Sequence, residues 1–191
     1  MNTTRAFNIL ALATICTMTT FSQDTLAQDA NEAARIKQGF AITPVPLNLT
    51  GKNPALVGLG SYIVNAQGGC SDCHTNPPFA AGGDPFLGEP AVINQAGYLA
   101  GGTAFGPFIS RNLTPNSAGR PANLTWAQFL FVLNTGADVK GVPPFVPSVQ
   151  GDLLQVMPWP VYRHMSERDK RAIYEYLRAI PCVGSAQRCG T

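Results

Sequence analysis

Apolar side chains recur at helical spacing in three segments of this chain, and the pattern predicts three helices. The first predicted helix runs from about Pro54, which suits a first helical turn, to Gln67, where two consecutive glycines end it. Its apolar positions are Leu56, Leu59, Ile63 and Ala66. Gly58 and Gly60 cost stability inside a helix, so we expect them to mark the close approach of another element.

The second and third predicted helices are defined by their ends. Thr125 precedes the second helix, Gln128 occupies the capping-box position, and Gly136 stops the helix. The third helix begins at Ser166 and extends to about Ile180, because a proline follows. The predicted buried positions are Trp126, Phe129, Leu130 and Leu133 in the second helix and Ile173, Tyr174, Tyr176, Leu177 and Ile180 in the third.

Long stretches rich in glycine and proline separate these helices. Residues 28–53 are polar and then broken by prolines, which predicts an N-terminal arm before a domain over residues 54–191. Residues 75–122 also contain several aromatic side chains, namely Phe79, Phe86, Phe105 and Phe108. Because disordered segments are poor in aromatics, we expect an ordered covering loop with a short hairpin around Tyr98–Ser110, rather than a flexible insert.

The first 27 residues have the pattern of an export signal. Arg5 gives a positive start, Ile9–Phe21 is mostly apolar, and residues 25–27 resemble a cleavage site. We therefore expect cleavage near Ala27 and a periplasmic protein, a retained membrane anchor being the alternative. Cys16 would be removed with the signal. The formal net charge of +2 includes no dense basic or acidic run, which gives no indication of nucleic-acid binding.

One short string carries most of the chemical information. Residues 70–74 have the form C-x-x-C-H, the spacing typical of a covalent attachment site for c-type haem. In that interpretation Cys70 and Cys73 form thioethers, and His74 is the proximal iron ligand. A redox dithiol needs no following histidine, and a zinc site needs four ligands, whereas His164 is the only other histidine. We therefore predict haem c as the cofactor.

Met157 is the favoured second iron ligand. It lies in a proline-rich stretch, and a residue before proline is pushed toward an extended backbone, so a stiff loop is expected at residues 155–160. His164 or an empty sixth position are the alternatives. With both axial positions filled, no small-molecule substrate would reach the iron. The chain would then transfer electrons and not act as an enzyme, whereas an open position would suit a haem sensor or enzyme.

Cys182 and Cys189 remain as a pair near the C-terminus. In an oxidising compartment such a pair can close a small loop, which predicts a structural disulfide. Two free thiols or a metal-binding pair are the alternatives.

Several segments together resemble a known family. They are Gly60–Val64, Gly69–Thr75, Ile109–Pro115, Thr125–Gly136, Met157–Trp159 and Ala172–Arg178. In this order they resemble a class I-type monohaem cytochrome c domain, and in particular the haem domains of cytochrome c subunits from bacterial membrane-associated dehydrogenases. The resemblance covers roughly residues 55–181. Those subunits often carry three haem domains, whereas this chain has a single C-x-x-C-H motif.

The resemblance implies an all-α, cytochrome c-like fold with three main helices around one covalently bound haem. The first and last helices would cross near Gly58 and Gly60. It also implies His/Met ligation and electron transfer through Fe(III)/Fe(II), either as a free periplasmic carrier or as the electron-accepting subunit of a dehydrogenase complex. Its partners would be redox proteins (a dehydrogenase, an oxidase or another cytochrome), with membrane contact only through a partner.

Further residues are candidates for supporting the haem. In class I cytochromes a proline carbonyl accepts a hydrogen bond from the proximal histidine, a role that falls here to Pro77 or Pro78. Arg111 is a candidate for neutralising a haem propionate, an ordinary surface arginine being the alternative. The aromatic candidates for lining the pocket are Trp126, Trp159 and Tyr162, for which general core packing is the other interpretation.

Overall fold

The structure is a computed structural model that describes residues 26–139 and 153–190. The chain divides into two compact units, residues 1–35 and residues 36–191. Most of the predicted signal and Cys16 lie outside the described residues. No helix within the described part is long and apolar enough to cross a membrane.

The predicted N-terminal arm is largely helical. The described residues 26–42 are helical. Alanines are frequent over its length and the first proline comes only at Pro44, so the local helix propensity is high. The prolines after the helix, not its polar composition, therefore decide where regular structure ends.

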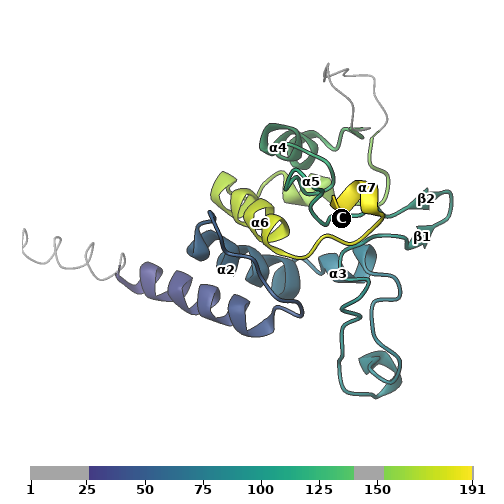
Figure 1. Cartoon of the computed structure of the whole chain (residues 1–191). Coiled ribbons are helices and arrows are strands. Elements are labelled where there is room, and N and C mark those ends of the chain that lie inside the picture. The colour runs from purple at the N-terminus through teal and green to yellow at the C-terminus, as the bar shows by residue number, and fades with distance from the viewer. Residues whose placement is uncertain (1–25, 140–152, 191) are drawn as a thin grey trace, which may run out of the picture. The chain divides into compact units, whose positions relative to one another are not determined.

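The second unit is mostly helical and contains one small hairpin (Figure 1). Its described elements are α2 (Pro54–Tyr62), a π-helical turn (Ile63–Gln67), α3 (Cys70–His74), a 3-10 turn (Pro85–Leu87), β1 (Ala104–Phe105), β2 (Phe108–Ile109), α4 (Trp126–Thr135), α5 (Trp159–Tyr162), α6 (Glu167–Ala179) and α7 (Ala186–Cys189). β1 and β2 are antiparallel and lie within the stretch for which a hairpin was expected. The fold is thus not purely α-helical.

The three main helices begin where their local signals predict, but α2 ends at Tyr62, and a π-helical turn continues from there to the predicted end at Gln67. Asn53 caps α2 by accepting hydrogen bonds from two backbone amides. Thr125 and Gln128 form a complete capping box on α4, and Gly136 ends that helix with a φ of +71°. Ser166 caps α6 by accepting from the Asp169 amide. The buried positions of α4 are Phe129, Val132 and Leu133, whereas Trp126 and Leu130 are only half-buried.

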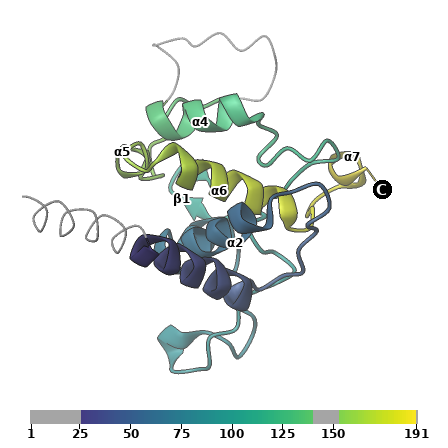
Figure 2. The ribbon, with the colours of Figure 1, turned by 90° about the vertical axis from the view of Figure 1, so that its left-hand side faces the viewer.

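Helix α6 lies between α2 on one side and α4 on the other (Figure 2). Gly60 lies on α2 where this helix crosses α6. A Cβ atom at Gly60 would lie 2.5 Å from the carbonyl carbon of Ala172 and 2.8 Å from the Cβ atom of Tyr176. A Cβ atom at Gly58 would lie 2.6 Å from the ring of Phe40. The expected close approach at both glycines is confirmed.

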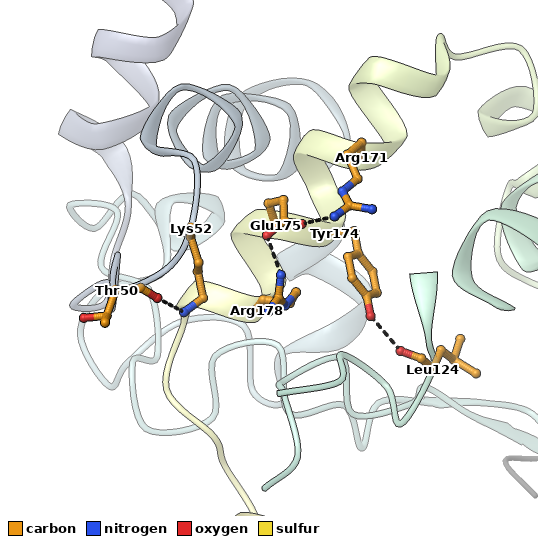
Figure 3. A network of polar contacts seen from close by, with 7 residues as sticks. All are labelled: Thr50, Lys52, Leu124, Arg171, Tyr174, Glu175 and Arg178. Carbon is orange, nitrogen blue, oxygen red and sulfur yellow. Dashed lines mark hydrogen bonds and ion pairs between the residues drawn. The ribbon is translucent and has the colours of Figure 1, made fainter. Parts of the chain in front are cut away.

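The buried carboxylate of Glu175 forms ion pairs with two arginines of α6 (Figure 3). Glu175 is 4% exposed, and its two oxygens lie 2.7 Å from Arg171 and 2.9 Å from Arg178. The neighbouring Tyr174 hydroxyl donates to the Leu124 carbonyl at 3.0 Å, which ties α6 to the loop before α4. One carboxylate thus serves two arginines one helical turn to either side of it.

A buried cation joins α6 to α4. The ammonium group of Lys170, a residue that is 4% exposed, donates to the Asn134 side chain at 2.6 Å and to the Arg163 carbonyl at 2.8 Å. Neither acceptor carries a charge. Within residues 26–139 and 153–190, the lysine is therefore held by two hydrogen bonds and by no ion pair.

The C-terminal tail packs against the segment at residues 112–117. Cys182 and Cys189 are joined by a disulfide. Asn112 donates to the Val183 carbonyl at 2.7 Å, and the Ser117 amide donates to the Arg188 carbonyl at 2.7 Å. The tail is therefore held by hydrogen bonds as well as by the covalent link.

Candidate haem site

The whole C-x-x-C-H motif lies on one short helix. Gly69 precedes α3 with a φ of +54°, a left-handed conformation that allows the chain to turn out of the preceding π-helical turn. Cys70 and Cys73 are three residues apart, so their side chains lie on the same side of α3. Both are free thiols. Two thiols presented together on one helical turn suit a ligand that is bonded at two neighbouring positions.

The thiols are not activated as nucleophiles. Burial raises the pKa of Cys70 to about 12, and burial together with the charge of Asp72 raises the pKa of Cys73. Redox-active cysteines have lowered pKa values, so these shifts disfavour the dithiol alternative. Among the described residues, no group of three or more His, Cys, Asp or Glu side chains lies close enough together to hold a metal ion.

The tautomer of His74 follows from one hydrogen bond. Its Nδ1 atom lies 2.7 Å from the Arg111 carbonyl oxygen. Because a carbonyl oxygen can only accept, Nδ1 carries the proton, and the lone pair of Nε2 remains available for a metal. Burial lowers the pKa of His74, although the same hydrogen bond raises it in part. The neutral imidazole required of an iron ligand is therefore favoured.

The acceptor for His74 is not one of the predicted prolines. The Pro77 carbonyl accepts from the Asn94 side chain at 3.0 Å, and the Pro78 carbonyl accepts from the Asn94 amide at 3.1 Å. Both carbonyls are thus used to fold the loop after the motif back on itself. The Arg111 carbonyl, 37 residues away along the chain, takes their place.

The Arg111 side chain has protein partners of its own. Its guanidinium group forms an ion pair with Asp138 and donates to the Val139 carbonyl at 3.0 Å. Asp138 was not singled out by the sequence, because a lone aspartate after a helix carries no distinctive signal. The role of Arg111 toward a haem propionate remains a prediction.

Met157 and Tyr162 pack against the same apolar cluster as Cys70. Met157 is half-buried, and α5 begins two residues after it at Trp159, so the expected extended loop is shorter than predicted. The Tyr162 hydroxyl donates to the Gly68 carbonyl at 3.1 Å, directly before the motif. Burial and the nearby thiols raise the pKa of Tyr162 to about 12. Tyr162 therefore lies beside the attachment helix.

The two tryptophans differ in their surroundings. The Trp159 ring packs against Gly136, and its indole nitrogen donates to the Leu154 carbonyl at 3.2 Å. The Trp126 ring instead packs edge-on against Tyr174, with ring centroids 5.5 Å apart, and Arg171 lies over it at 4.9 Å. These contacts of Trp126 join α4 to α6 and correspond to the core-packing interpretation.

Two curated proteins are similar to this chain. The gluconate 2-dehydrogenase cytochrome c subunit of Pantoea cypripedii is 30% identical over 137 residues, which are 71% of this chain and 26% of that protein. The cytochrome c subunit of the quinone alcohol dehydrogenase from Gluconobacter oxydans (strain 621H) is 27% identical over 137 residues, 70% of this chain and 26% of that protein.

The chain thus spans about a quarter of the length of the curated relatives it matches. No family model and no solved structure matches it. The similarity to two cytochrome c subunits supports a cytochrome c domain in this chain, with haem c as the cofactor that such relatives imply.

Proposed function

We propose that this domain carries one haem c, bound covalently through Cys70 and Cys73, and transfers single electrons between redox proteins. The observation that best supports the proposal is the hydrogen bond from His74 Nδ1 to a backbone carbonyl. It leaves Nε2 free on the same helical turn that presents two unpaired thiols. Attachment and axial ligation thereby come from one five-residue helix.

The remaining residues of the site would act on the bound group in distinct ways. The haem would supply an iron that cycles between Fe(III) and Fe(II), taking up or releasing one electron. Met157 would provide the second axial ligand from a half-buried position, and an apolar surrounding with a thioether ligand favours the less charged state. Tyr162, hydrogen-bonded to Gly68, would fix the chain leading into the attachment helix.

A spectroscopic experiment tests this ligand set. The protein, produced in cells that attach haem c, should show sharp α and β bands when reduced and a sulfur-to-iron charge-transfer band when oxidised, with no response to carbon monoxide. Met157→Ala should abolish the charge-transfer band and permit carbon monoxide binding. Met165→Ala is the matched control, because Met165 is also partly buried but packs against α2 and α6 residues.

Other outcomes would contradict parts of the proposal. A wild-type protein without covalent haem would refute it as a whole. Covalent haem with a spectrum unchanged by Met157→Ala would retain the attachment site but exclude Met157 as ligand, in favour of His164 or an open position. An open position would redirect the function toward sensing or catalysis.

The proposed partner is a dehydrogenase, because both curated relatives are named as dehydrogenase cytochrome c subunits. Two arrangements are possible on this basis: a free periplasmic carrier, which we favour, and a subunit held in the complex. Purification under mild conditions distinguishes them. A stable complex subunit would be recovered together with a large dehydrogenase polypeptide, whereas a carrier would be recovered alone and would accept electrons from the dehydrogenase on mixing.

A further inference from the structure

His74 is held by two chain segments that approach it from outside α3. Its backbone carbonyl accepts from the Gly101 amide at 2.6 Å, and its ring donates to the Arg111 carbonyl at 2.7 Å. The next residue, Thr75, accepts from the Leu99 amide at 3.0 Å through its hydroxyl. The main chain and the ring of the histidine are thus positioned separately.

The two segments also contact each other. The Leu113 amide donates to the Leu99 carbonyl at 2.8 Å, and the Gly102 amide donates to the Ser110 carbonyl at 3.0 Å. Gly101 lies between these two bonds and is buried. Gly101 therefore lies at the point where the segment bonded to the His74 backbone meets the segment that carries the Arg111 carbonyl.

Gly101 has no room for a side chain. Its φ is +74°, and a Cβ atom there would lie 2.5 Å from the Arg111 carbonyl carbon, 2.7 Å from the Arg111 carbonyl oxygen and 2.5 Å from the Ser110 carbonyl oxygen. All three are backbone atoms, which cannot rotate aside as a side chain would. One of them is the acceptor for His74.

We infer that Gly101 is a positioning residue for the proximal histidine, because only a residue without a side chain lets the Arg111 carbonyl reach His74 Nδ1. The inference rests on the proposed function, in which His74 is the iron ligand. Gly101 acts on the ring through the Arg111 carbonyl and on the His74 backbone through its own amide.

Gly101→Ala should weaken the hydrogen bond from His74 and raise the reduction potential. A hydrogen-bonded imidazole is the more basic ligand and favours Fe(III), so its loss favours Fe(II). Changes in such outer partners alter ligand strength by about tenfold or more. A tenfold change in the preference between the two iron states corresponds to a shift of about 59 mV in a one-electron couple.

Two glycines provide matched controls. Gly82 has a φ of +75°, and a Cβ atom there would meet no atom within 4 Å. Gly102 has a φ of +94°, and its closest neighbour would be the Asn76 side chain at 3.7 Å. Gly82→Ala therefore introduces the same backbone strain without a collision, and Gly102→Ala introduces it in the same segment as Gly101.

The experiment measures the reduction potential of the four haem-loaded proteins by spectroelectrochemistry. A rise confined to Gly101→Ala supports the inference, whereas equal shifts in all three variants, or none, overturn it. If wild type binds no haem, the proposed function fails. If wild type and both controls carry haem at a common potential that Gly101→Ala shares, only the inference fails.

If Gly101→Ala does not accumulate, a measurement on the wild type tests the hydrogen bond on which the inference depends. Nuclear magnetic resonance of the reduced protein can detect coupling across the hydrogen bond between His74 Nδ1 and the Arg111 carbonyl carbon. Detection of that coupling, with slow exchange of the Nδ1 proton, supports the inference. A proton that exchanges at once with solvent, or that couples to another carbonyl, overturns it.

Discussion

Replacing Gly60 with alanine should force α2 away from α6. The added Cβ atom would lie 2.5 Å from the Ala172 carbonyl carbon and 2.8 Å from the Tyr176 Cβ atom. Carbon atoms in ordinary contact are about 3.5–4.0 Å apart, so the helices would have to separate by roughly 1 Å. Leu59 on α2 and Ala172 on α6, which are 1% and 0% exposed, belong to one buried cluster and would lose contact in consequence.

Two opposing effects determine the size of the change. Alanine is favoured over glycine inside a helix by about 1 kcal/mol, which would stabilise α2. Overpacking costs typically about 1–3 kcal/mol, and a gap of 0.5–1 Å forfeits about a quarter to a half of the dispersion attraction around it. Because Ala172 meets the new atom with its backbone, relief by side-chain rotation is excluded. Taking the upper part of the overpacking range and subtracting the helix-propensity gain, we expect a net loss of roughly 1–2 kcal/mol.

Thermal unfolding of the haem-loaded protein, followed by circular dichroism, measures this loss. For a chain of this length the melting temperature should fall by roughly 2–8 °C. Ala127→Gly on the exposed side of α4 calibrates the propensity effect, with an expected cost of about 1 kcal/mol. A melting temperature of Gly60→Ala equal to or above that of the wild type would refute the close crossing of α2 and α6.

Three further changes test other parts of the fold by the same melting experiment. Lys170→Ala removes the donor of two part-buried hydrogen bonds and should cost about 1–2 kcal/mol, whereas Lys37→Ala on the surface should stay within about 0.5 kcal/mol. The double variant Cys182→Ser, Cys189→Ser frees the short C-terminal loop and should cost about 2.5 kcal/mol by loop entropy. Glu175→Gln weakens both ion pairs of a buried carboxylate, whose two arginines are 39% and 34% exposed, so the cost should be only about 1 kcal/mol.

Each of these changes has an outcome that contradicts its reasoning. Equal melting temperatures for Lys170→Ala and Lys37→Ala would show that the buried ammonium group contributes nothing. An unchanged melting temperature of the double cysteine variant would mean that the hydrogen bonds of the tail suffice. For Glu175→Gln, a loss several times larger than expected would show that solvent screens the arginines less than their exposure implies.

The ends of the main helices were predictable because their signals are local. A capping box at Thr125, a cap at Ser166, the glycine after α4 and the proline after α6 act within a few residues of the chain. Gly60 was predictable as a point of close approach for a related reason. A glycine inside a helix costs stability, so it is expected where a neighbouring element packs too closely for a side chain. What Gly60 faces, the Ala172 backbone on α6, could not be read from α2 alone.

In the candidate haem site, too, some features follow from the local sequence and others only from the tertiary structure. The proposed attachment cysteines and the proposed ligand His74 are specified by residue type at fixed spacing, so the sequence by itself determined these candidates. The partner of His74 was decided only by the tertiary structure, because every residue has a carbonyl and no side chain marks the one that will accept. Arg111 reaches His74 across 37 residues, and Gly101 permits the approach by lacking a side chain. Local residue spacing therefore identified His74 as the candidate ligand, and long-range packing determines how its side chain is held.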